Sequence, residues 1–583
     1  MFSPFPAKLR DCSTRITIWH RLLSILLSAM LLIRVAAAGA DEQVRIDIIE
    51  KIPNDPKPYH LRDWRAVAFE FDRLAFDSKA QGEHLPLVFQ MQYGEKRGFG
   101  LPCYVGDYRR RENSTRDRYN ESLATLGATI GASFVGIDKS AGPVNWVALC
   151  EQYYADQPDA GIIVNDPAER PAKSHWYVLF PNILFLALCD LYPDELNVQS
   201  IADRVCRRWL EVLRVLTDEG RQPDFDQTGF DFHEMKPVTN SRWIEPDSGA
   251  ALAWLMHAAY NRSVRQGNSA EALKYLEAVD WCLRFYEDRE TNPAYEILLP
   301  FGAYTTARMN AEHNRRYDVR KLLQWVFARS DARPTMIMIA NTWEGRDVHG
   351  LMGFTKQENP EQGYAFTMNT FATAWPIVPI ARYDDRFARV IGKWMLGAAN
   401  AARYFYPGEH PPSRQANPEW RGDAWNVIAY EGLRHKWMSP EEPLTAGGDP
   451  LTYGWGPKTD LGVYGSAYVG VFGSIVRATN HEKILRLDLL ATDLYRGEAY
   501  PTYLYFNPYS EAKDVAVALG DKPVDIYDAV SDTFLRRKVK GISYVEVPAD
   551  TSVVLVLTPA GGQVSVKGAK RSVDGVVIDY CVN

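Results

Sequence analysis

The sequence Asn-Ser-Arg-Trp-Ile-Glu-Pro-Asp-Ser-Gly at 240–249 leads directly into Ala-Ala-Leu-Ala-Trp-Leu-Met-His-Ala-Ala-Tyr at 250–260. Pro246 suits the first turn of a helix, and the aspartate and serine after it complement the free N–H groups and the positive dipole end of that turn. The residues from 250 to 260 are almost all apolar and leave no polar face at helical spacing. We therefore predict a helix that is buried on every side, with Trp243 and Glu245 just before its start.

The same all-apolar pattern recurs along the chain, each time near a segment with one apolar and one polar face. The segments predicted to be buried are 123–135, 178–192, 250–260, 298–310, 366–381 and 461–478. The segments predicted to be half exposed are 64–77, 146–154, 198–216, 270–286, 319–327 and 387–404. Helices of an inner ring need no polar face, whereas helices of an outer ring need one. The pattern predicts a mainly α fold, an (α/α)6 toroid; an open α-solenoid is the alternative, but no fixed-period repeat supports it.

From Ile484 onward the periodicity changes from helix to strand. Runs rich in β-branched and aromatic residues alternate with Gly, Pro and Asp turns, which predicts a small antiparallel β-sandwich. The predicted organisation is therefore a signal peptide at 1–40, a toroidal catalytic domain at 41–483 and a C-terminal β-sandwich domain at 484–583.

The first forty residues have the pattern of a secretory signal. Basic residues up to Arg21 precede an apolar run at 22–33, and small residues at 36–40 offer a cleavage site. We expect the mature chain to be secreted or periplasmic, with an uncleaved anchor as the alternative. No later segment is long and apolar enough to predict a membrane span.

Composition is typical of a globular protein, and its many aromatic residues predict either a sugar-binding surface or a tryptophan-rich core. Hydrophobic residues are 46% and charged residues 24% of the 583 residues, and the net charge of −7 includes no basic stripe, so nucleic acid is not an expected partner. Aromatic residues reach 12%, with 16 Trp and 31 Tyr, which suits carbohydrate as the partner. The cysteines after residue 40 are scattered, and no glycine-rich phosphate loop is present, so no metal and no cofactor is expected.

The long loops predicted to enter the buried helices carry most of the unusual chemistry. The segments 218–246, 330–365 and 407–460 interleave carboxylates with indoles and phenols. Long loops on one face of a rigid scaffold commonly carry function, and we expect them to surround a central cavity. Glycosidic bond cleavage needs one carboxylic acid to protonate the leaving oxygen and a second carboxylate to activate water or attack the sugar.

The predicted architecture and this loop surface resemble the six-hairpin glycosidases with an appended β-domain. The run Glu-Ala-Tyr-Pro-Thr-Tyr-Leu-Tyr-Phe-Asn-Pro at 498–508 and Val-Val-Leu-Val-Leu-Thr-Pro from Val553 are similar to the sandwich tails of secreted bacterial glycan-processing proteins. The resemblance rests on architecture, and no family-defining catalytic motif is present, so it assigns no catalytic residue.

Position in the chain therefore selects the candidate acid and base. Glu245 precedes a buried helix and has Trp243 beside it to raise its pKa, as a general acid requires; the alternative is that Glu245 only caps the helix. Asp347 lies in a glycine-flanked loop near Trp343, and its alternative is a solvated loop acid. The substrate-binding candidates are Trp243, Trp343, Tyr364, Trp425 and Trp455. The reserve carboxylates are Glu344, Glu296, Glu431 and Asp231.

Three functions remain open at this point. The first is a secreted glycoside hydrolase that cleaves a poly- or oligosaccharide with two carboxylates. The second is a polysaccharide lyase, which would use a Tyr or His base and an Arg or Asn that neutralises a uronate. The groups available for it are Tyr364, His233, Arg242 and Asn240. The third is a non-catalytic glycan-binding surface protein. The lone histidines His233 and His349 predict neither a metal nor a base by themselves.

Overall fold

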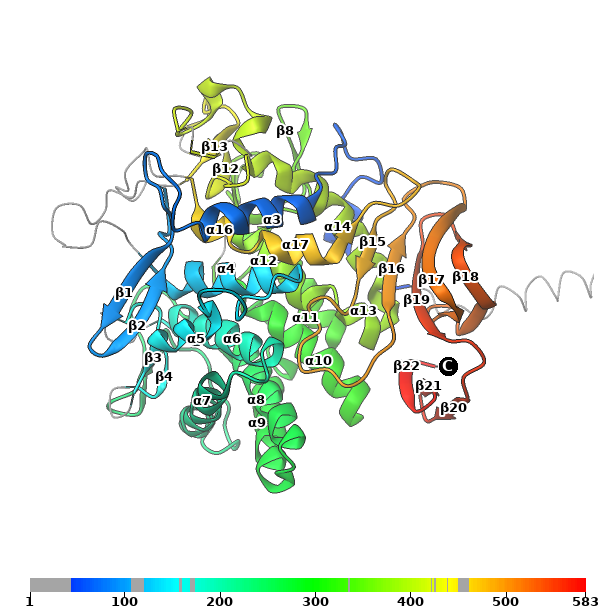
Figure 1. Cartoon of the computed structure of the whole chain (residues 1–583), viewed down its shortest axis with the longest axis horizontal. Coiled ribbons are helices and arrows are strands. Elements are labelled where there is room, and N and C mark those ends of the chain that lie inside the picture. The colour runs from blue at the N-terminus through cyan, green and yellow to red at the C-terminus, as the bar shows by residue number, and fades with distance from the viewer. Residues whose placement is uncertain are drawn as a thin grey trace, which may run out of the picture.

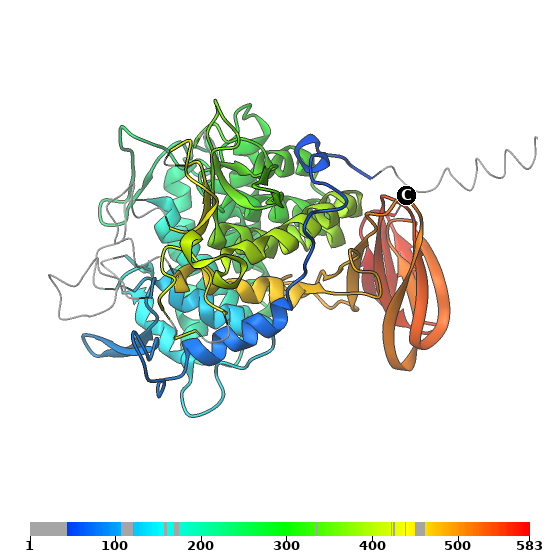
Figure 2. The same ribbon diagram turned by 90° about the horizontal axis from the view of Figure 1, so that it is seen from above.

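A helical body and a β-rich C-terminal part make up the chain (Figures 1 and 2). The computed structural model describes residues 43–105, 120–156, 160–167, 174–333, 336–420, 422–423, 426–437, 439–448 and 461–582. The predicted signal at 1–40, Trp425 and Trp455 lie outside these residues. No helix within the described ranges has the length and apolar character needed to cross a bilayer.

One set of helices is buried on nearly every side. These helices are α4 (Ser122–Phe134), α6 (His175–Leu191), α8 (Ser248–Arg265), α10 (Leu299–His313), α12 (Thr367–Ile377), α16 (Val463–Ser466) and α17 (Val469–Ile475). The helix predicted at 250–260 is confirmed as part of α8. Contacts run from α4 to α6, α8, α10, α12 and α17 in turn, and α17 contacts α4. A helix enclosed by neighbours needs no polar face, which explains the all-apolar sequences.

A second set of helices packs on the outside of the first. It consists of α2 (Asp47–Glu50), α3 (Trp64–Ala75), α5 (Trp146–Leu149), α7 (Leu196–Leu216), α9 (Ser269–Glu287), α11 (Val319–Phe327), α13 (Ile380–Tyr383) and α14 (Ala388–Ala401). Helices α3, α9 and α11 begin at side-chain caps, where Asp63, Asn268 and Asp318 accept backbone N–H groups of the first turn. Helix α14 was predicted to be half exposed, and that prediction is wrong. It is buried throughout because α2 and strands of the C-terminal sheet cover it.

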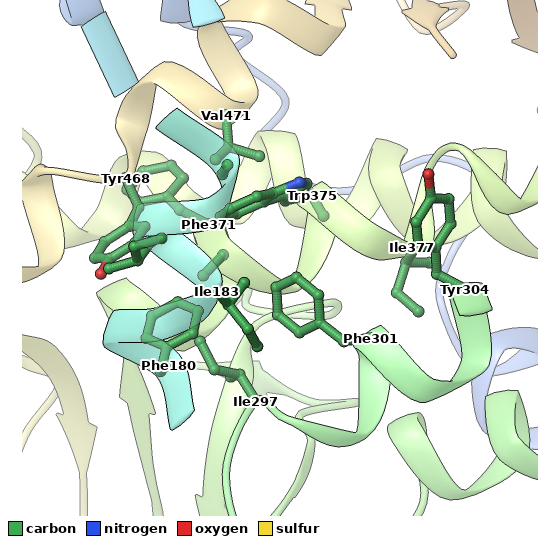
Figure 3. Packing of buried hydrophobic residues seen from close by; sticks show 14 of the residues in the cluster. Phe180, Ile183, Ile297, Phe301, Tyr304, Phe371, Trp375, Ile377, Tyr468 and Val471 are labelled. Atoms are coloured by element: carbon green, nitrogen blue, oxygen red, sulfur yellow. The ribbon is translucent and has the colours of Figure 1, made fainter. Parts of the chain in front are cut away.

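Aromatic side chains fill the space between the buried helices (Figure 3). The ring centroids of Phe180 and Tyr468 lie 5.8 Å apart, and those of Phe301 and Trp375 lie 5.4 Å apart. Ring pairs at such distances add to the stabilisation from burying their apolar area. Among the described residues, side chains therefore fill the centre of the helical body, where a cavity was expected. A site between these helices would have to lie at one of their ends.

A five-stranded antiparallel sheet replaces the long loops predicted between 330 and 460. Its order is β13 (Thr445–Gly447), β12 (Gly432–His435), β11 (Gly363–Phe366), β10 (Met352–Thr355) and β7 (Met336–Met338). Strand β11 continues directly into α12, and the N–H of Thr367 donates to the carbonyl oxygen of Glu431 at 2.9 Å. The sheet is thereby fixed to the first turn of a buried helix.

Small two-stranded sheets are formed by β1 (Phe89–Tyr93) with β2 (Lys96–Gly100), β3 (Tyr154–Ala155) with β4 (Ile162–Ile163), β5 (Gly229–Asp231) with β6 (Lys236–Val238), and β8 (Thr342–Trp343) with β9 (Arg346–Asp347).

The C-terminal part is a six-stranded sheet followed by a three-stranded sheet. The first has the order β14 (Val476–Arg477), β15 (Arg486–Asp488), β16 (Thr502–Phe506), β19 (Ser552–Pro559), β17 (Lys513–Asp528) and β18 (Thr533–Val547), and the second β20 (Val564–Lys567), β21 (Lys570–Val573) and β22 (Val576–Asp579). Strands β16 and β19 contact α14. The buried guanidinium of Arg389 on α14 donates to Asp550 at 2.9 Å and also pairs with Glu50. The sheet is therefore joined to the helical body by a buried, paired charge.

The predicted fold class, a mainly α toroid with a small β-sandwich, is wrong. Helix accounts for 38% and strand for 22% of the structure, and sheets occur within the helical body as well as after it. The predicted set of regular helix pairs is also not found, since α5 and α13 are single turns. Helical periodicity detects long helices, but the strands of the five-stranded sheet are too short to show a clear period, and β11 pairs with β12 across a large separation in sequence.

Candidate functional site

The buried helices α6, α8, α10 and α12 are linked to one another at the ends where they begin. Glu245, just before α8, binds the first turn of α6. Asp247 accepts N–H groups from the segment before α10, and Asn369 in the first turn of α12 donates to Glu296. These cross-links place the starts of four helices at one end of the body. Free N–H groups and positive dipole ends meet there, which suits carboxylates and anions.

Glu245 is completely enclosed at this end, with 0% of its surface exposed. Its carboxylate accepts the Ser174 hydroxyl at 2.8 Å, the Trp176 N–H at 2.7 Å and the Trp243 indole N–H at 2.8 Å. Burial raises the pKa of Glu245 to about 7, although all these hydrogen bonds favour the ionised form.

The surroundings of Glu245 match a cap more closely than an acid in contact with substrate. Ser174 and Trp176 are the N-cap and an early residue of α6, so the carboxylate satisfies the start of a helix other than its own. Trp243 is 36% exposed and lies against the carboxylate through its indole N–H. The predicted pair of Glu245 and Trp243 does exist, but the indole closes the carboxylate off.

Asp247, two residues further on, repeats this role for the next helix. It is fully buried, and its Oδ2 accepts the N–H groups of Tyr295 at 3.0 Å and Glu296 at 3.1 Å. Burial raises the pKa of Asp247 to about 7. The carboxylate therefore fixes the backbone that carries Tyr295 and Glu296.

Asp347 lies in a different environment from Glu245. It ends the β8–β9 hairpin, where it accepts the Lys57 N–H and the Thr342 hydroxyl, each at 2.5 Å. His349 Nδ1 lies 3.8 Å from Asp347. In the described part of the chain none of these partners contacts Glu245, so the structure does not bring the predicted acid and base together.

The aromatic candidates also differ in how open they are. Trp343 and Tyr364 are completely buried, and Trp343 stacks on His435 with ring centroids 5.7 Å apart. Both belong to the packing of the sheet region rather than to an open surface. Of the predicted aromatic residues that the structure describes, only Trp243 presents a large exposed face.

Glu296 is the reserve carboxylate that the structure places best. It directly follows Tyr295 ahead of α10, and 13% of its side chain is exposed. Its carboxylate forms an ion pair with Arg333, and Asn369 Nδ2 donates to Oε2 at 2.7 Å. Two donors from two other segments hold this partly open carboxylate in one orientation.

Aromatic rings surround this ion pair. The guanidinium of Arg333 lies over the ring of Tyr295 at 4.9 Å and over that of Phe354 at 4.5 Å. Phe354 in turn packs against Phe366 and Trp437, with centroid distances of 4.9 Å and 6.2 Å. Phe354 is buried, while Tyr295, Phe366 and Trp437 are half-buried, and aromatic rings next to a charged pair suit a sugar ring and its hydroxyl groups.

Tyr177 joins this group to the start of α4. It is 38% exposed on α6, and burial of its phenol together with the negative charge of Glu121 raises its pKa, while Arg333 opposes the shift. Glu121 is the N-cap residue of α4. We call the set of Glu121, Tyr177, Tyr295, Glu296, Arg333 and Asn369 the helix-start site.

The other reserve groups do not join this site. Asp231 accepts the N–H groups of His233 and Glu234, and Asn240 accepts those of Arg242 and Trp243, as in ordinary polar turns. Glu344 lines an open hollow of about 480 Å³ with Glu361, Arg414, His435 and Lys436. Glu431 contributes its carbonyl oxygen to the first turn of α12.

Sequence reasoning did not select Tyr177, Arg333 or Asn369. Tyr177 and Asn369 lie within or beside segments that read as apolar helices, so the polar group at the first turn was counted as part of the core. Each lies within the first turn of its helix, next to the free N–H groups. A search for polar residues in first turns of buried helices would have found both.

Comparison with known proteins adds no family to this geometry. A scan against protein-family models and a search of curated proteins each found no match to the chain.

Proposed function

We propose that the chain is a glycan-processing enzyme, with a glycoside hydrolase as the first candidate, and that its reaction takes place at the helix-start site. The observation that carries the proposal is the orientation of Glu296 between Arg333 and Asn369, beside the rings of Tyr295 and Phe354. This combination offers a positioned carboxylate and an apolar platform in one place. The likeness of the C-terminal runs at 498–508 and from Val553 to the sandwich tails of secreted bacterial glycan-processing proteins agrees with the proposal.

In this hydrolase Glu296 acts as the ionised carboxylate. The guanidinium of Arg333 favours its charged form, as a nucleophile or a general base requires. Asn369 fixes the oxygen that does not take part in the attack. Glu121, whose negative charge acts on Tyr177, supplies in this proposal the second carboxyl group that hydrolysis needs to protonate the leaving oxygen.

A polysaccharide lyase is the second candidate because Arg333 and Asn369 lie beside tyrosines. A lyase neutralises a uronate carboxylate with such donors, while a tyrosine removes the proton next to it. In this case Glu296 orients Arg333, and Tyr177 or Tyr295 acts as the base. A protein that only binds a glycan would use the same surface without turnover.

A product assay separates these functions. The full chain is incubated with a panel of neutral and uronate-containing glycans, and reducing ends and ultraviolet absorbance are measured together. A hydrolase releases reducing ends without new absorbance, and a lyase releases both because its product carries an unsaturated sugar. Binding without either signal would leave only the glycan-binding function.

We also propose that the chain is exported, because the basic lead and the apolar run at 1–33 are typical of a secretory signal. Sequencing the N-terminus of material recovered outside the cytoplasm tests this. A start near residue 41 supports cleavage, whereas an intact Met1 would contradict it.

A further inference from the structure

Two histidines and a glutamate meet at the end of the buried helices opposite the helix-start site. His257 lies in the second half of α8, and Glu312 and His313 are the last residues of α10. One ligand atom from each of the three side chains lies within 4.8 Å of the others. The chain therefore brings together two imidazoles and a carboxylate well away from the proposed reaction.

The Nε2 atoms of the two histidines have no hydrogen-bond partner, whereas Nδ1 of His257 lies 3.5 Å from the side-chain amide of Asn261. His257 is only 2% exposed, and its Nε2 lies 3.5 Å from Glu312 Oε2, which is longer than a good hydrogen bond. The Nε2 atoms of His257 and His313 are both buried without a partner. A buried polar atom left unpaired costs free energy, so native structures seldom keep one without a reason.

The donor atoms of the three side chains suit metal binding. A histidine binds a metal through a ring nitrogen that carries no proton, and the unpaired Nε2 atoms of His257 and His313 can supply such lone pairs. Arg308 donates to both carboxylate oxygens of Glu312 at 3.0 Å. Neutral imidazoles with a carboxylate form a donor set that transition metals, and zinc in particular, accept.

We propose that His257, Glu312 and His313 bind a divalent zinc ion, with water as the fourth ligand. Zinc–nitrogen and zinc–oxygen bonds of about 2.0–2.2 Å require the ligand atoms to close in by about 1 Å, which small side-chain rotations supply. Arg308 acts as the outer partner that orients the carboxylate. Lys570 also lies close by, since its ammonium donates to the Glu312 carbonyl oxygen at 3.2 Å. The positive charges of Arg308 and Lys570 repel a cation and lower the zinc affinity relative to a site without them.

The consequence of binding is structural. Zinc would join the second half of α8 to the last turn of α10, close to the β21 strand that carries Lys570. Without metal, the same side chains can rotate so that His257 donates from Nε2 to Glu312. These two arrangements differ in metal content and are therefore separable by experiment.

The full chain is stripped with a chelator, dialysed against zinc and analysed for bound metal, followed by cobalt substitution and absorption spectroscopy. We expect one retained equivalent of zinc, a higher melting temperature with zinc than without it, and the visible absorption of four-coordinate cobalt. His257→Gln and His313→Gln should each weaken binding by more than about 100-fold, because even outer-shell partners cost 10–100-fold.

His233→Gln is the matched control, since His233 lies in an exposed polar turn and should leave zinc binding unchanged. If His257→Gln does not fold, His313→Gln at the edge of the core decides the question. Absence of retained zinc in the wild-type chain, or equal zinc in the two ligand variants and the wild type, would overturn the proposal.

Discussion

The segments before α8 and α10 each place a glutamate near the start of a buried helix, yet they use it in opposite ways. Glu245 is 0% exposed, and its hydrogen-bond donors close around it. Glu296 keeps 13% of its side chain exposed and is held from two sides by Arg333 and Asn369. The difference shows that a carboxylate that lies next to both an indole and the start of a helix can serve as a cap for a neighbouring helix, as Glu245 does for α6. Access and orientation, rather than position in the chain, are the reasons for which we propose Glu296 as the reacting group.

The largest expected effect is on catalysis at Glu296. Glu296→Gln should lower kcat by about 10²–10⁴-fold, because positioned acid–base groups contribute that much, while the amide keeps the volume and a hydrogen bond. Release of reducing ends from the responsive glycan measures the loss, and circular dichroism checks the fold. Glu271→Gln, which removes a half-buried carboxylate on α9 that pairs with Lys274, is the control and should keep full activity. If the Glu296→Gln chain kept full activity, Glu296 would not be the reacting group, and the proposed difference between the segments before α8 and α10 would be wrong.

The next effect is on stability at Glu245. Glu245→Gln places an amide N–H₂ among N–H and O–H donors, so at pH 5 it should lower the free energy of unfolding by about 1–3 kcal/mol. Because the side chain does not reach substrate, kcat should change less than about threefold. Denaturant unfolding and activity assays at the same pH measure both quantities. A large loss of kcat in a folded variant would return the catalytic role to Glu245.

The pH dependence of the same variant sharpens this point. The pKa of Glu245 is raised by burial from 4.5 to about 7, so its neutral form is favoured in the folded state. The resulting stability is present below pH 4.5 and is lost as pH rises to 7, by at most about 3 kcal/mol at 1.36 kcal/mol per pKa unit. The wild type should therefore lose stability relative to Glu245→Gln between pH 4.5 and 7. A constant difference across this range would show that Glu245 has an ordinary pKa.

A further effect on stability is expected at Trp243. Trp243→Phe keeps an aromatic ring but removes the indole N–H that donates to Glu245 at 2.8 Å. We expect a loss of about 1.5–3 kcal/mol at pH 8, where the carboxylate is charged, and a smaller loss at pH 5. Thermal unfolding at the two pH values measures the difference. Equal losses at both would mean that the hydrogen bond to the charged form contributes nothing specific.

Much of the helical body could be predicted from sequence, and the reason is physical. The all-apolar run at 250–260 has no alternative to full burial, and the structure confirms it as α8. By contrast, the sheet that joins β7 to β13 depends on the pairing of β11 with β12, in which Gly363 lies opposite His435, and local patterns do not encode such a pairing. The fold class was wrong for this reason.

The candidate site was predicted only in part. The sequence predicted Glu245 just before a helix, where the structure places it, and Glu296 was among the reserve carboxylates. It could not rank Glu296 above Glu245, because Arg333 and Asn369 approach Glu296 from other parts of the chain. The reasons for choosing Glu245, a neighbouring indole and a raised pKa, are both found in the structure, yet they arise from complete burial.

The most direct test of the account is a crystal structure of the Glu296→Gln chain with an oligosaccharide that the wild type cleaves. We predict a sugar ring packed against Tyr295 and Phe354, with the scissile bond within hydrogen-bond reach of the side chain at position 296 and Glu245 still enclosed by Trp243. An oligosaccharide bound instead in the hollow lined by Glu344 and Arg414, or one whose scissile bond contacts Glu245, would contradict the account.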